Sequence, residues 1–595
     1  MHTTPFRASA LAMAGLLAVG CADPATDPLG DVQTPSFDVS TYDCAAQSEI
    51  PAAECAALVA LYGSTNGPGW TDHSGWLANT TPCSWFGVLC DDGHVVEMVL
   101  GSNLLAGPIP PELGNLGSLR NLWLLDNQLT GAIPAALGDL DSLGNLQLMN
   151  NQLTGPIPVE LGSLGSLANL MLGGNRFTGS MPAELGNLAN LERLNIGGNQ
   201  LTGTIPAGLG GLSKLVALEI GANQLTGPIP PELGRLADLE NLWLGGNQLT
   251  GTIPTELGDL GSLAILKLAG NQLTGSIPSE LGRLSRLQYL ELAQNLLTGG
   301  IPLELGDLGS LLSLQLSQNP LTGAIPAELG NLGNLRSLNI TQTQLSGAIP
   351  ADLGRLTQLE QLNLMQNQLT GPIPAQLGDL ANLKSLVLMM NQLTGTIPTA
   401  LGGLARLESL QLLGNRLTGP IPAGIGNLAS LRLLNVTGNQ LAGLVPLAAA
   451  ERGAVIQATS GTSRCQFAPP GNVFLYMPNT QSYRNADLDQ DGRICGLALY
   501  APATVAGRLT SAVSWFLGQG VLNAGQAAAL SRKIDQAMKL FDKGNPAEAT
   551  EVLQGFIEQV NSLVWTDLVL SEQQAAPLIE WAEIMMALIE MGART

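Results

Sequence analysis

The sequence predicts an α/β solenoid with a parallel sheet on its concave side, followed by a C-terminal all-α bundle. Two observations predict this fold. A 24-residue pattern repeats without insertion or deletion from residue 93 to 447, and helical patterning replaces it after residue 500. A chain of 595 residues is too long for one compact core. Its 72 Gly and 36 Pro would suggest disorder if scattered, but they follow the period, which is typical of a solenoid.

The most regular position of the repeat is an asparagine. It recurs in every turn but one, where Thr343 replaces it. The series is Asn103, Asn127, Asn151, Asn175, Asn199, Asn223, Asn247, Asn271, Asn295, Asn319, Asn367, Asn391, Asn415 and Asn439, which makes 15 turns with Thr343. An amide both donates and accepts, so stacked asparagines can satisfy buried backbone groups of neighbouring turns. We expect Thr343 to leave at least one backbone group without its side-chain partner.

The other residues that recur with the 24-residue period explain the shape of one turn. Leu122 and Leu124 alternate with period two, which predicts a short strand with both leucines inward. Stacked strands form the concave parallel sheet. Ile133-Pro134 predicts a second extended piece, and Leu137 closes the core from an irregular or 3-10 convex side.

The pattern LxxLxLxxNxLTGxIPxxLGxL resembles the plant-type leucine-rich repeat. Residues 44–92, with the segments NGPGW, GW and CSWFGVLC, resemble the N-terminal cap of such proteins. We expect Trp70, Trp76 and Trp85 to cover the first turn as core residues rather than to bind a ligand. The resemblance implies a recognition module, because plant-type repeats serve as receptor ectodomains and as inhibitors of wall-degrading enzymes.

The N-terminus indicates export and lipid attachment. The apolar run 8–19 is too short to span a bilayer. It ends in LAVGC, which resembles a bacterial lipobox, although such boxes usually carry Leu where this chain has Ala18. We expect Cys21 to carry a diacylglycerol, with residues 1–21 as the signal and 22–43 as a tether. The alternative is an ordinary signal peptide with an incidental cysteine.

Assigning Cys21 to lipid leaves six of the seven cysteines. Proximity suggests the pairs Cys44–Cys55, Cys83–Cys90 and Cys465–Cys495, one of many connectivities that six thiols allow. An extracellular compartment would permit all three.

Two further segments follow the repeats. Residues 448–500 suggest a C-terminal cap in which Asp487, Asp489 and Asp491 precede a glycine, resembling a calcium loop and the Excalibur-type segment of secreted bacterial proteins. The twelfth position is Ala498 rather than Glu, so the alternative is a polar turn held by a disulfide. Residues 501–595 predict about four helices, one starting at Asn545-Pro546, and resemble the FIMAH-type helical module.

Candidate binding residues lie on the outward positions of the predicted strands. Amides predominate there, and two tryptophans point outward among mostly small neighbours, which favours ligand contact over a core role. The alternative is that the two rings only cover exposed sheet. The candidates are Trp123, Gln147, Met171, Asn195, Glu219, Trp243, Lys267, Tyr289 and Glu291. Many residues one and two positions before the asparagine are Gly or Ala, so we expect the middle of this face to be flat and open.

Composition narrows the function. A net charge of −22 excludes nucleic acid as a partner and favours membrane attachment by lipid alone. No nucleophile–base set, metalloprotease motif or phosphate loop occurs, so we expect no enzyme activity. We expect a lipid-anchored surface module of the bacterial envelope that binds an extracellular protein, peptide or glycan, with calcium as the single candidate cofactor. The alternative is a structural spacer or adhesin whose near-identical repeats only set its length.

Overall fold

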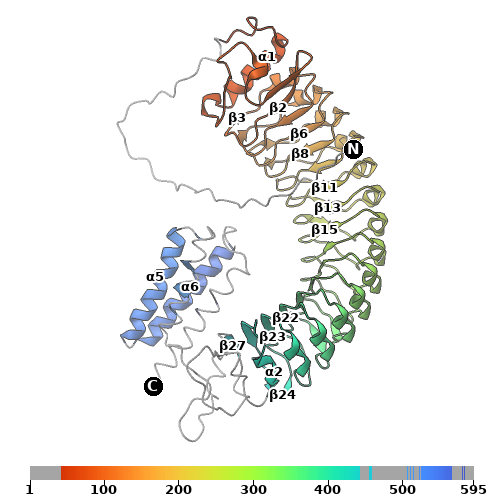
Figure 1. Ribbon diagram of the computed structural model, residues 1–595, viewed down its shortest axis with the longest axis vertical. Helices are drawn as coiled ribbons and strands as arrows, with labels where there is room; N and C mark the ends of the chain where they lie inside the picture. Colours follow the sequence, from red (N-terminus) through yellow and green to blue (C-terminus); the bar gives the residue numbers. More distant parts are fainter. Residues whose placement is uncertain are drawn as a thin grey trace. The chain divides into compact units, whose positions relative to one another are not determined.

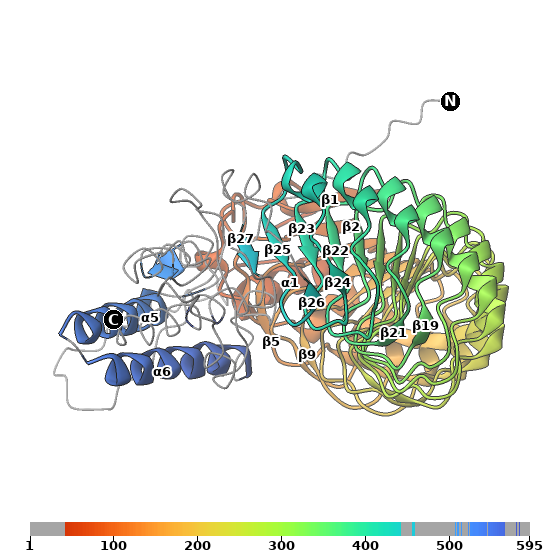
Figure 2. The ribbon, with the colours of Figure 1, turned by 90° about the horizontal axis from the view of Figure 1, so that it is seen from below.

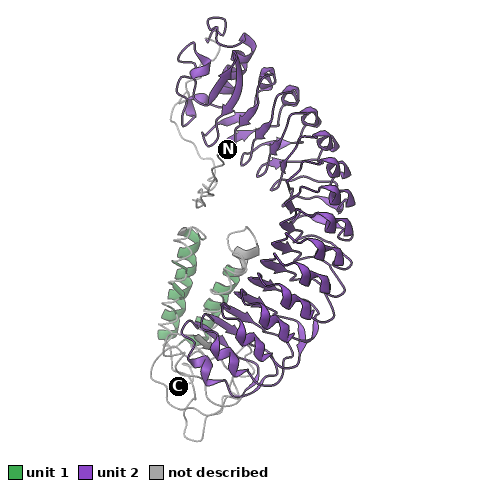
Figure 3. Cartoon of the chain, turned by 45° about the vertical axis from the view of Figure 1, so that its right-hand side comes forward, with its two compact units in different colours: residues 1–32, 467–595 green, residues 33–466 purple. Residues whose placement is uncertain are grey.

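The computed structural model describes residues 42–441 and 455–457, the helical segments 524–543 and 545–565, and a few single positions between 506 and 582. The chain divides into two compact units, one within residues 33–466 and one that contains the helices after residue 467 (Figure 3). Each unit is described by itself below.

The first unit is a curved solenoid whose inner side is a parallel sheet (Figure 1). Within the described residues this sheet has 17 strands, parallel throughout except for the antiparallel first pair. The strands are β1 (Val88–Asp91), β2 (His94–Val99), β4 (Asn121–Trp123), β6 (Asn145–Gln147), β8 (Asn169–Met171), β10 (Arg193–Asn195), β11 (Ala217–Glu219), β13 (Asn241–Trp243), β15 (Ile265–Lys267), β16 (Tyr289–Glu291), β17 (Ser313–Gln315), β18 (Ser337–Asn339), β20 (Gln361–Asn363), β22 (Ser385–Val387), β23 (Ser409–Gln411), β25 (Leu433–Asn435) and β27 (Val455–Gln457).

The register of this sheet follows the repeat. Asn121 lies opposite Asn145, and Trp123 lies opposite Gln147, so residues 24 positions apart form one column across the strands. The leucines Leu122 and Leu124 are fully buried, as predicted from their alternation. The final strand, β27, pairs with β25 beyond the last recognisable repeat, which the sequence pattern did not indicate.

Shorter parallel pairs line the flank after each asparagine. They are β3 (Ala106–Pro108) with β5 (Gln128–Thr130), β7 (Thr154–Gly155) with β9 (Arg176–Phe177), β12 (Thr226–Pro228) with β14 (Gln248–Thr250), β19 (Ser346–Ala348) with β21 (Gln368–Thr370), and β24 (Thr418–Gly419) with β26 (Gln440–Leu441). The second strand of this turn precedes Ile133-Pro134, and Pro134 itself has the expected extended backbone, with φ −64° and ψ 134°. The paired residues are Gln128–Thr130, because Gly131 turns the chain with φ 74° and Pro134 already leads into the next 3-10 helix.

The convex side consists of 3-10 turns, as expected. They span Pro111–Asn115, Ala135–Asp139, Val159–Ser163, Ala183–Asn187, Ala207–Gly211, Pro231–Arg235, Thr255–Asp259, Ser279–Arg283, Leu303–Asp307, Ala327–Asn331, Ala351–Arg355, Ala375–Asp379 and Thr399–Gly403, and the four-residue α2 (Ala423–Gly426) takes the place of the next one. Adjacent turns approach closely here: a Cβ on Gly258 would lie 2.5 Å from the backbone oxygen of Glu280. Glycine is therefore required at this position by contact with the next turn.

The asparagines form the predicted ladder. Nδ2 of Asn127 donates to the backbone oxygens of Leu100 (2.9 Å) and Leu124 (3.0 Å), and its Oδ1 accepts from the N–H of Leu105 (3.0 Å). Each intact asparagine thus joins its own turn to the preceding one and satisfies backbone groups that water does not reach.

Thr343 breaks this ladder as expected. Its hydroxyl donates to Oδ1 of Asn367 and accepts from the N–H of Leu345 at 3.4 Å. The N–H groups of Leu297 and Leu369 each bind an asparagine Oδ1, but the N–H of their counterpart Leu321 makes no such bond to Thr343 in this described segment. The preceding turn has Pro320 where other turns have a residue that donates a backbone hydrogen bond, so two weak points adjoin.

The N-terminal cap consists of α1 (Ala52–Ser64), the 3-10 turns Gly67–Gly69 and Pro82–Ser84, and the β1–β2 hairpin. Trp70, Trp76 and Trp85 are 3%, 3% and 1% exposed, which confirms the core interpretation. The disulfides Cys44–Cys55 and Cys83–Cys90 are both formed, as their proximity suggested.

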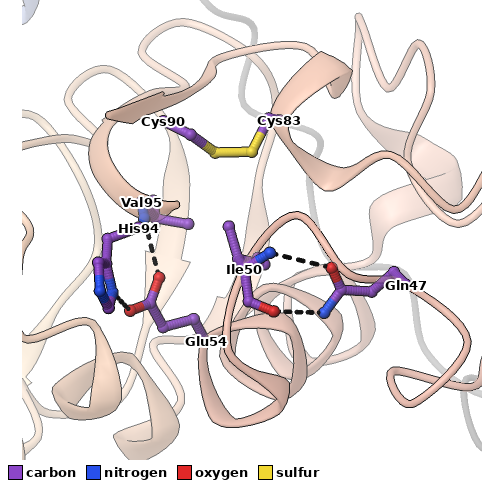
Figure 4. A network of polar contacts seen from close by, with 7 residues as sticks. All are labelled: Gln47, Ile50, Glu54, Cys83, Cys90, His94 and Val95. Carbon is purple, nitrogen blue, oxygen red and sulfur yellow. Dashed lines mark hydrogen bonds and ion pairs between the residues drawn. A yellow bond between two sulfur atoms is a disulfide. The ribbon is translucent and has the colours of Figure 1, made fainter. Parts of the chain in front are cut away.

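The buried carboxylate of Glu54 links helix α1 to strand β2 (Figure 4). Glu54 accepts hydrogen bonds from the N–H of Val95 (2.8 Å) and from Nδ1 of His94 (2.6 Å). Hydrogen bonding to Glu54, and then its negative charge, raise the pKa of His94. Next to this pair, Gln47 closes the turn before α1 through Ile50.

The second unit contains two long helices, α5 (Ala524–Asp542) and α6 (Pro546–Trp565), which lie side by side in both views (Figures 1 and 2). Helix α6 begins at the proline predicted for its first turn, and the N–H of Ala549 bonds to the backbone oxygen of Asn545. The described residues do not extend to the remaining helices that the sequence predicts.

Candidate functional site

The predicted binding residues all lie on the inner sheet. Trp123, Gln147, Met171, Asn195, Glu219, Trp243, Lys267 and Glu291 each end a strand from β4 to β16, and Tyr289 begins β16. Because these strands pair in register, the first eight form a single column across the concave face. Within it the structure brings two groups into direct contact.

The first group is Asn195 and Glu219. Nδ2 of Asn195 donates to the Glu219 carboxylate at 2.7 Å, and Oδ1 of Asn195 accepts from the N–H of Gly197 at 3.1 Å. A Cβ on Gly173 would lie 2.5 Å from that Oδ1. Because Gly173 has no side chain, the Asn195 side chain of the next turn can pack against its backbone.

The second group centres on Trp243, whose side chain is 44% exposed. Nζ of Lys267 lies 5.1 Å from the centre of the Trp243 ring and 3.3 Å from the Glu291 carboxylate. A Cβ on Gly221 would lie 2.6 Å from Nε1 of Trp243, so this glycine also accommodates a neighbouring side chain. The middle of the face is open only in part: side chains of Asn195 and Trp243 lie over Gly173 and Gly221, whereas Gly198 and Gly246 are exposed.

Trp123 differs from Trp243. It is only half-exposed, and its Nε1 is covered while making no hydrogen bond to any described residue. Gln147 and Met171, on the next two strands, are half-buried. We therefore place the accessible aromatic surface at Trp243 rather than at both tryptophans.

A polar row that the sequence analysis missed runs beside this column. Nδ2 of Asn121 donates to Glu97 (2.8 Å), Asn145 donates to Asn121 (2.6 Å), and Asn169 donates to Asn145 (2.5 Å). The signal was present in the sequence, because three asparagines recur with the 24-residue period at the first position of a strand. Their side chains bind one another on the concave surface, unlike those of the buried ladder.

The position just before the ladder asparagine was also missed. The chain adopts a left-handed conformation there, and six turns use glycine. Four successive turns instead place exposed glutamines there: Gln294, Gln318, Gln342 and Gln366, with φ from 54° to 57°. This conformation is unfavourable for residues with a Cβ.

The described residues contain no group of His, Cys, Asp and Glu arranged to hold a metal ion. The charged residues at the edge before the strands, including Glu192, Lys214, Asp238, Glu240 and Arg286, line a shallow depression of about 500 Å³. Charges of both signs alternate around it, and none of the predicted site residues lies in it.

Comparison with known proteins gives the family. Residues 262–415 match the leucine-rich repeat region family, and residues 161–225, 238–260 and 406–428 match further leucine-rich repeat families. The leucine-rich repeat ectodomain of the Arabidopsis receptor kinase HAESA, solved with an IDA peptide hormone, is 37% identical over 68% of this chain and 69% of that chain, with a TM-score of 0.60. The chain belongs to the leucine-rich repeat family.

Other similarities of this leucine-rich repeat protein agree. Residues 51–91 match the leucine-rich repeat N-terminal domain, and residues 506–587 match the FIMAH domain. The PEPR1–AtPEP1 complex is 34% identical, covering 68% of this chain and 58% of that one, with a TM-score of 0.63. Leucine-rich repeat protein 1 of Oryza sativa is 43% identical over 73 residues, so the chain spans only 34% of that relative's length.

Several predicted sites fall outside the described residues. These are the lipid attachment at Cys21, the disulfide Cys465–Cys495 and the calcium ligands Asp487, Asp489 and Asp491. No helix in the described part of the leucine-rich repeat chain is both long and apolar enough to cross a membrane.

Proposed function

We propose that the leucine-rich repeats form an extracellular recognition module that binds a protein, peptide or glycan on the concave face. The supporting observation is the exposed ring of Trp243. Lys267 lies over this ring, and the ring packs against the backbone of Gly221. Aromatic and cationic side chains are enriched where partners bind tightly. The HAESA ectodomain, which has this fold, is solved with a peptide hormone ligand, and this supports a ligand-binding role for the repeats.

A structural spacer or adhesin is the second candidate. The near identity of the buried residues from turn to turn favours the spacer, because identical turns fix the length of a solenoid without any need for a ligand. The concave columns favour recognition instead, since Trp243, Lys267 and Tyr289 depart from the amides found in other turns.

Binding arrays distinguish the two. The purified protein is applied to a peptide array and a glycan array, together with Trp243→Ala and the control Leu303→Ala. Leu303 is a 54% exposed apolar residue of the convex 3-10 turns, so its removal changes a similar kind of surface elsewhere. Recognition predicts ligands whose affinity falls about tenfold or more in Trp243→Ala alone. No ligand on either array, or equal loss in both variants, supports the spacer.

We propose lipid attachment at Cys21 and a location on a bacterial cell envelope. The lipobox-like segment LAVGC and the odd number of seven cysteines support this. Mass spectrometry of the N-terminus of the protein from membranes is expected to show a diacylglycerol-modified Cys21, and Cys21→Ser should release the protein. An unmodified first residue other than Cys21 contradicts the proposal.

We propose no enzyme activity and no resident cofactor except calcium. The spacing of Asp487, Asp489 and Asp491 supports a hard-cation site, and the missing acid at Ala498 implies weak affinity. Calorimetry of the full chain with calcium should show heat of binding that Asp489→Ala abolishes. Absence of that heat at millimolar calcium makes the segment a polar turn.

A further inference from the structure

The concave face changes chemistry along the solenoid. From β2 to β16 its outward strand positions include charged residues, namely Glu97, Arg193, Glu219, Lys267 and Glu291. From β17 to β25 the first and last positions of each strand contain no charged residue. The chain has a net charge of −22, so a face without charged residues across six strands differs in charge from the rest of the surface.

The first three of these strands carry only amides and hydroxyls. Their outward residues are Ser313, Gln315, Ser337, Asn339, Gln361 and Asn363, which we call the amide–hydroxyl face. All six are half-buried or exposed. Amides and hydroxyls both donate and accept hydrogen bonds, so this face presents both roles without a charge.

The hydrogen bonds within this face are mostly local. Nε2 of Gln315 donates to the hydroxyls of Ser313 (3.0 Å) and Ser337 (3.2 Å). Oδ1 of Asn339, between these strands, is covered and accepts no hydrogen bond from any described residue. A covered polar atom without a partner is unusual, and this one becomes accessible to a ligand only if the Asn339 side chain rotates.

The exposed glutamines extend the same chemistry to the rim. Gln318, Gln342 and Gln366 follow the three strands with φ of 56°, 54° and 54°, at a position that is glycine in six other turns and Ser, Asp, Asn, Ala or Met in five. Nε2 of Gln318 donates to Oε1 of Gln342 at 2.7 Å. A left-handed conformation costs a residue with a Cβ about 1–2 kcal/mol. An exposed surface hydrogen bond recovers only part of this cost, so stability alone does not explain these residues.

We propose that the amide–hydroxyl face and the glutamine rim bind a neutral polysaccharide that runs across the strands. This rests on the proposed function, since it names the ligand class for one part of the concave face. A polysaccharide offers closely spaced hydroxyls that donate and accept, which suits a row of amides and hydroxyls. Tyr289, on the adjacent strand β16, adds an aromatic ring at one end of the row.

A charged peptide fits this region less well. Its ionised groups would lose hydration against a surface that offers no opposite charge, which is unfavourable. The charged residues next to this face, Arg336, Glu360 and Lys384, stand one position before the strands, and Lys384 pairs with Glu360 at 2.5 Å. A peptide finds charged partners in the Trp243–Lys267–Glu291 group instead.

Affinity electrophoresis of the intact protein tests the proposal. Native gels contain hydroxyethyl cellulose, soluble β-1,3-glucan, dextran or, as an anionic comparison, polygalacturonate. The test variant is Gln318→Gly with Gln342→Gly, because glycine suits the left-handed conformation and removes only the side chains. The control is Gln344→Ala with Gln368→Ala, two exposed glutamines on the flank after the ladder position.

We expect at least one neutral polysaccharide to retard the protein, with a dissociation constant that rises about tenfold in the glycine variant and is unchanged in the control. Added NaCl should not weaken the retardation, since no ion pair is involved. The melting temperature of the glycine variant should not fall, which excludes unfolding as the cause.

Three results overturn the proposal: no retardation by any neutral polysaccharide, retardation by polygalacturonate alone, or equal retardation of the glycine variant. If peptides bind and Trp243→Ala abolishes that binding while no neutral polysaccharide binds, the recognition function stands and the polysaccharide proposal fails. If neither peptide nor glycan binds, both fail.

Discussion

The ladder asparagines and the residues four positions before them lie in the same turns but differ in almost every respect. The ladder position is asparagine in 14 of 15 turns and is buried in most of them. The earlier position holds seven residue types in the same 15 turns. Ladder side chains bind backbone groups of adjacent turns, whereas Trp243, Lys267 and Glu291 of the other column contact one another's side chains. The ladder position maintains the solenoid, and the position four residues before it can vary to recognise a ligand.

The largest expected effect tests contact between turns. In Gly258→Ala the new Cβ would lie 2.5 Å from the backbone oxygen of Glu280, so the backbone must shift. We expect the free energy of unfolding to fall by about 1–3 kcal/mol. Gly261→Ala, three residues later, is the matched control because no atom lies within 4 Å of its Cβ. Chemical denaturation of both variants measures the difference, and equal loss in the two would refute the packing account.

The ladder itself is tested at its irregular turn. Thr343→Asn should raise the free energy of unfolding by about 1 kcal/mol, because the amide regains bonds to backbone groups that include the Leu321 N–H. Asn295→Thr should lower it by a similar amount, since Asn295 bonds to Leu268 (3.0 Å), Leu292 (3.1 Å) and Leu273 (3.0 Å).

Hydrogen exchange locates the same effect. The Leu321 amide should exchange faster than the Leu297 amide, which is held by Asn319 at 3.0 Å, and Thr343→Asn should slow it. Slow exchange at Leu321 in the unaltered protein, with no gain from Thr343→Asn, would mean that threonine fits the ladder fully.

The smallest expected effect concerns the cap. The folded pKa of His94 is raised by its hydrogen bond to Glu54, so the charged imidazole stabilises the folded state. That contribution is complete below the unfolded pKa of about 6.5 and is lost as pH rises through the folded pKa. The melting temperature should therefore decline slightly over this range, and His94→Gln should remove the decline. The change is small because the His94 side chain is 46% exposed.

The features that depend on the repeat period and on the burial of apolar residues could be predicted from the sequence. Regular spacing gave the inner strands, the ladder and the position of Thr343, and the need to cover the first turn explained Trp70, Trp76 and Trp85. The positions of exposed side chains were harder to predict. Whether Gly221 leaves a gap depends on Trp243, which is 22 residues away and packs over it.

The bond between His94 and Glu54 joins residues 40 positions apart, and no local pattern indicates it. The left-handed glutamines were missed because the same position is glycine in six other turns, which suggested an empty surface. In each case the missing information is contact between separate parts of the chain rather than local preference.

One turn allows the most direct test of the division between scaffold and recognition surface. Trp243 and Asn247 stand four residues apart, one 44% exposed on the concave face and the other 8% exposed in the ladder. Unfolding by denaturant is measured for Trp243→Ala and Asn247→Ala. We expect Asn247→Ala to lose about 1–3 kcal/mol, because Asn247 bonds to Leu244 (2.9 Å), Ile220 (3.2 Å) and Leu225 (3.0 Å). Trp243→Ala should cost less than Asn247→Ala, because the ring is 44% exposed and its removal leaves no buried backbone group without a partner. Equal losses, or a larger loss for Trp243→Ala, would contradict the account.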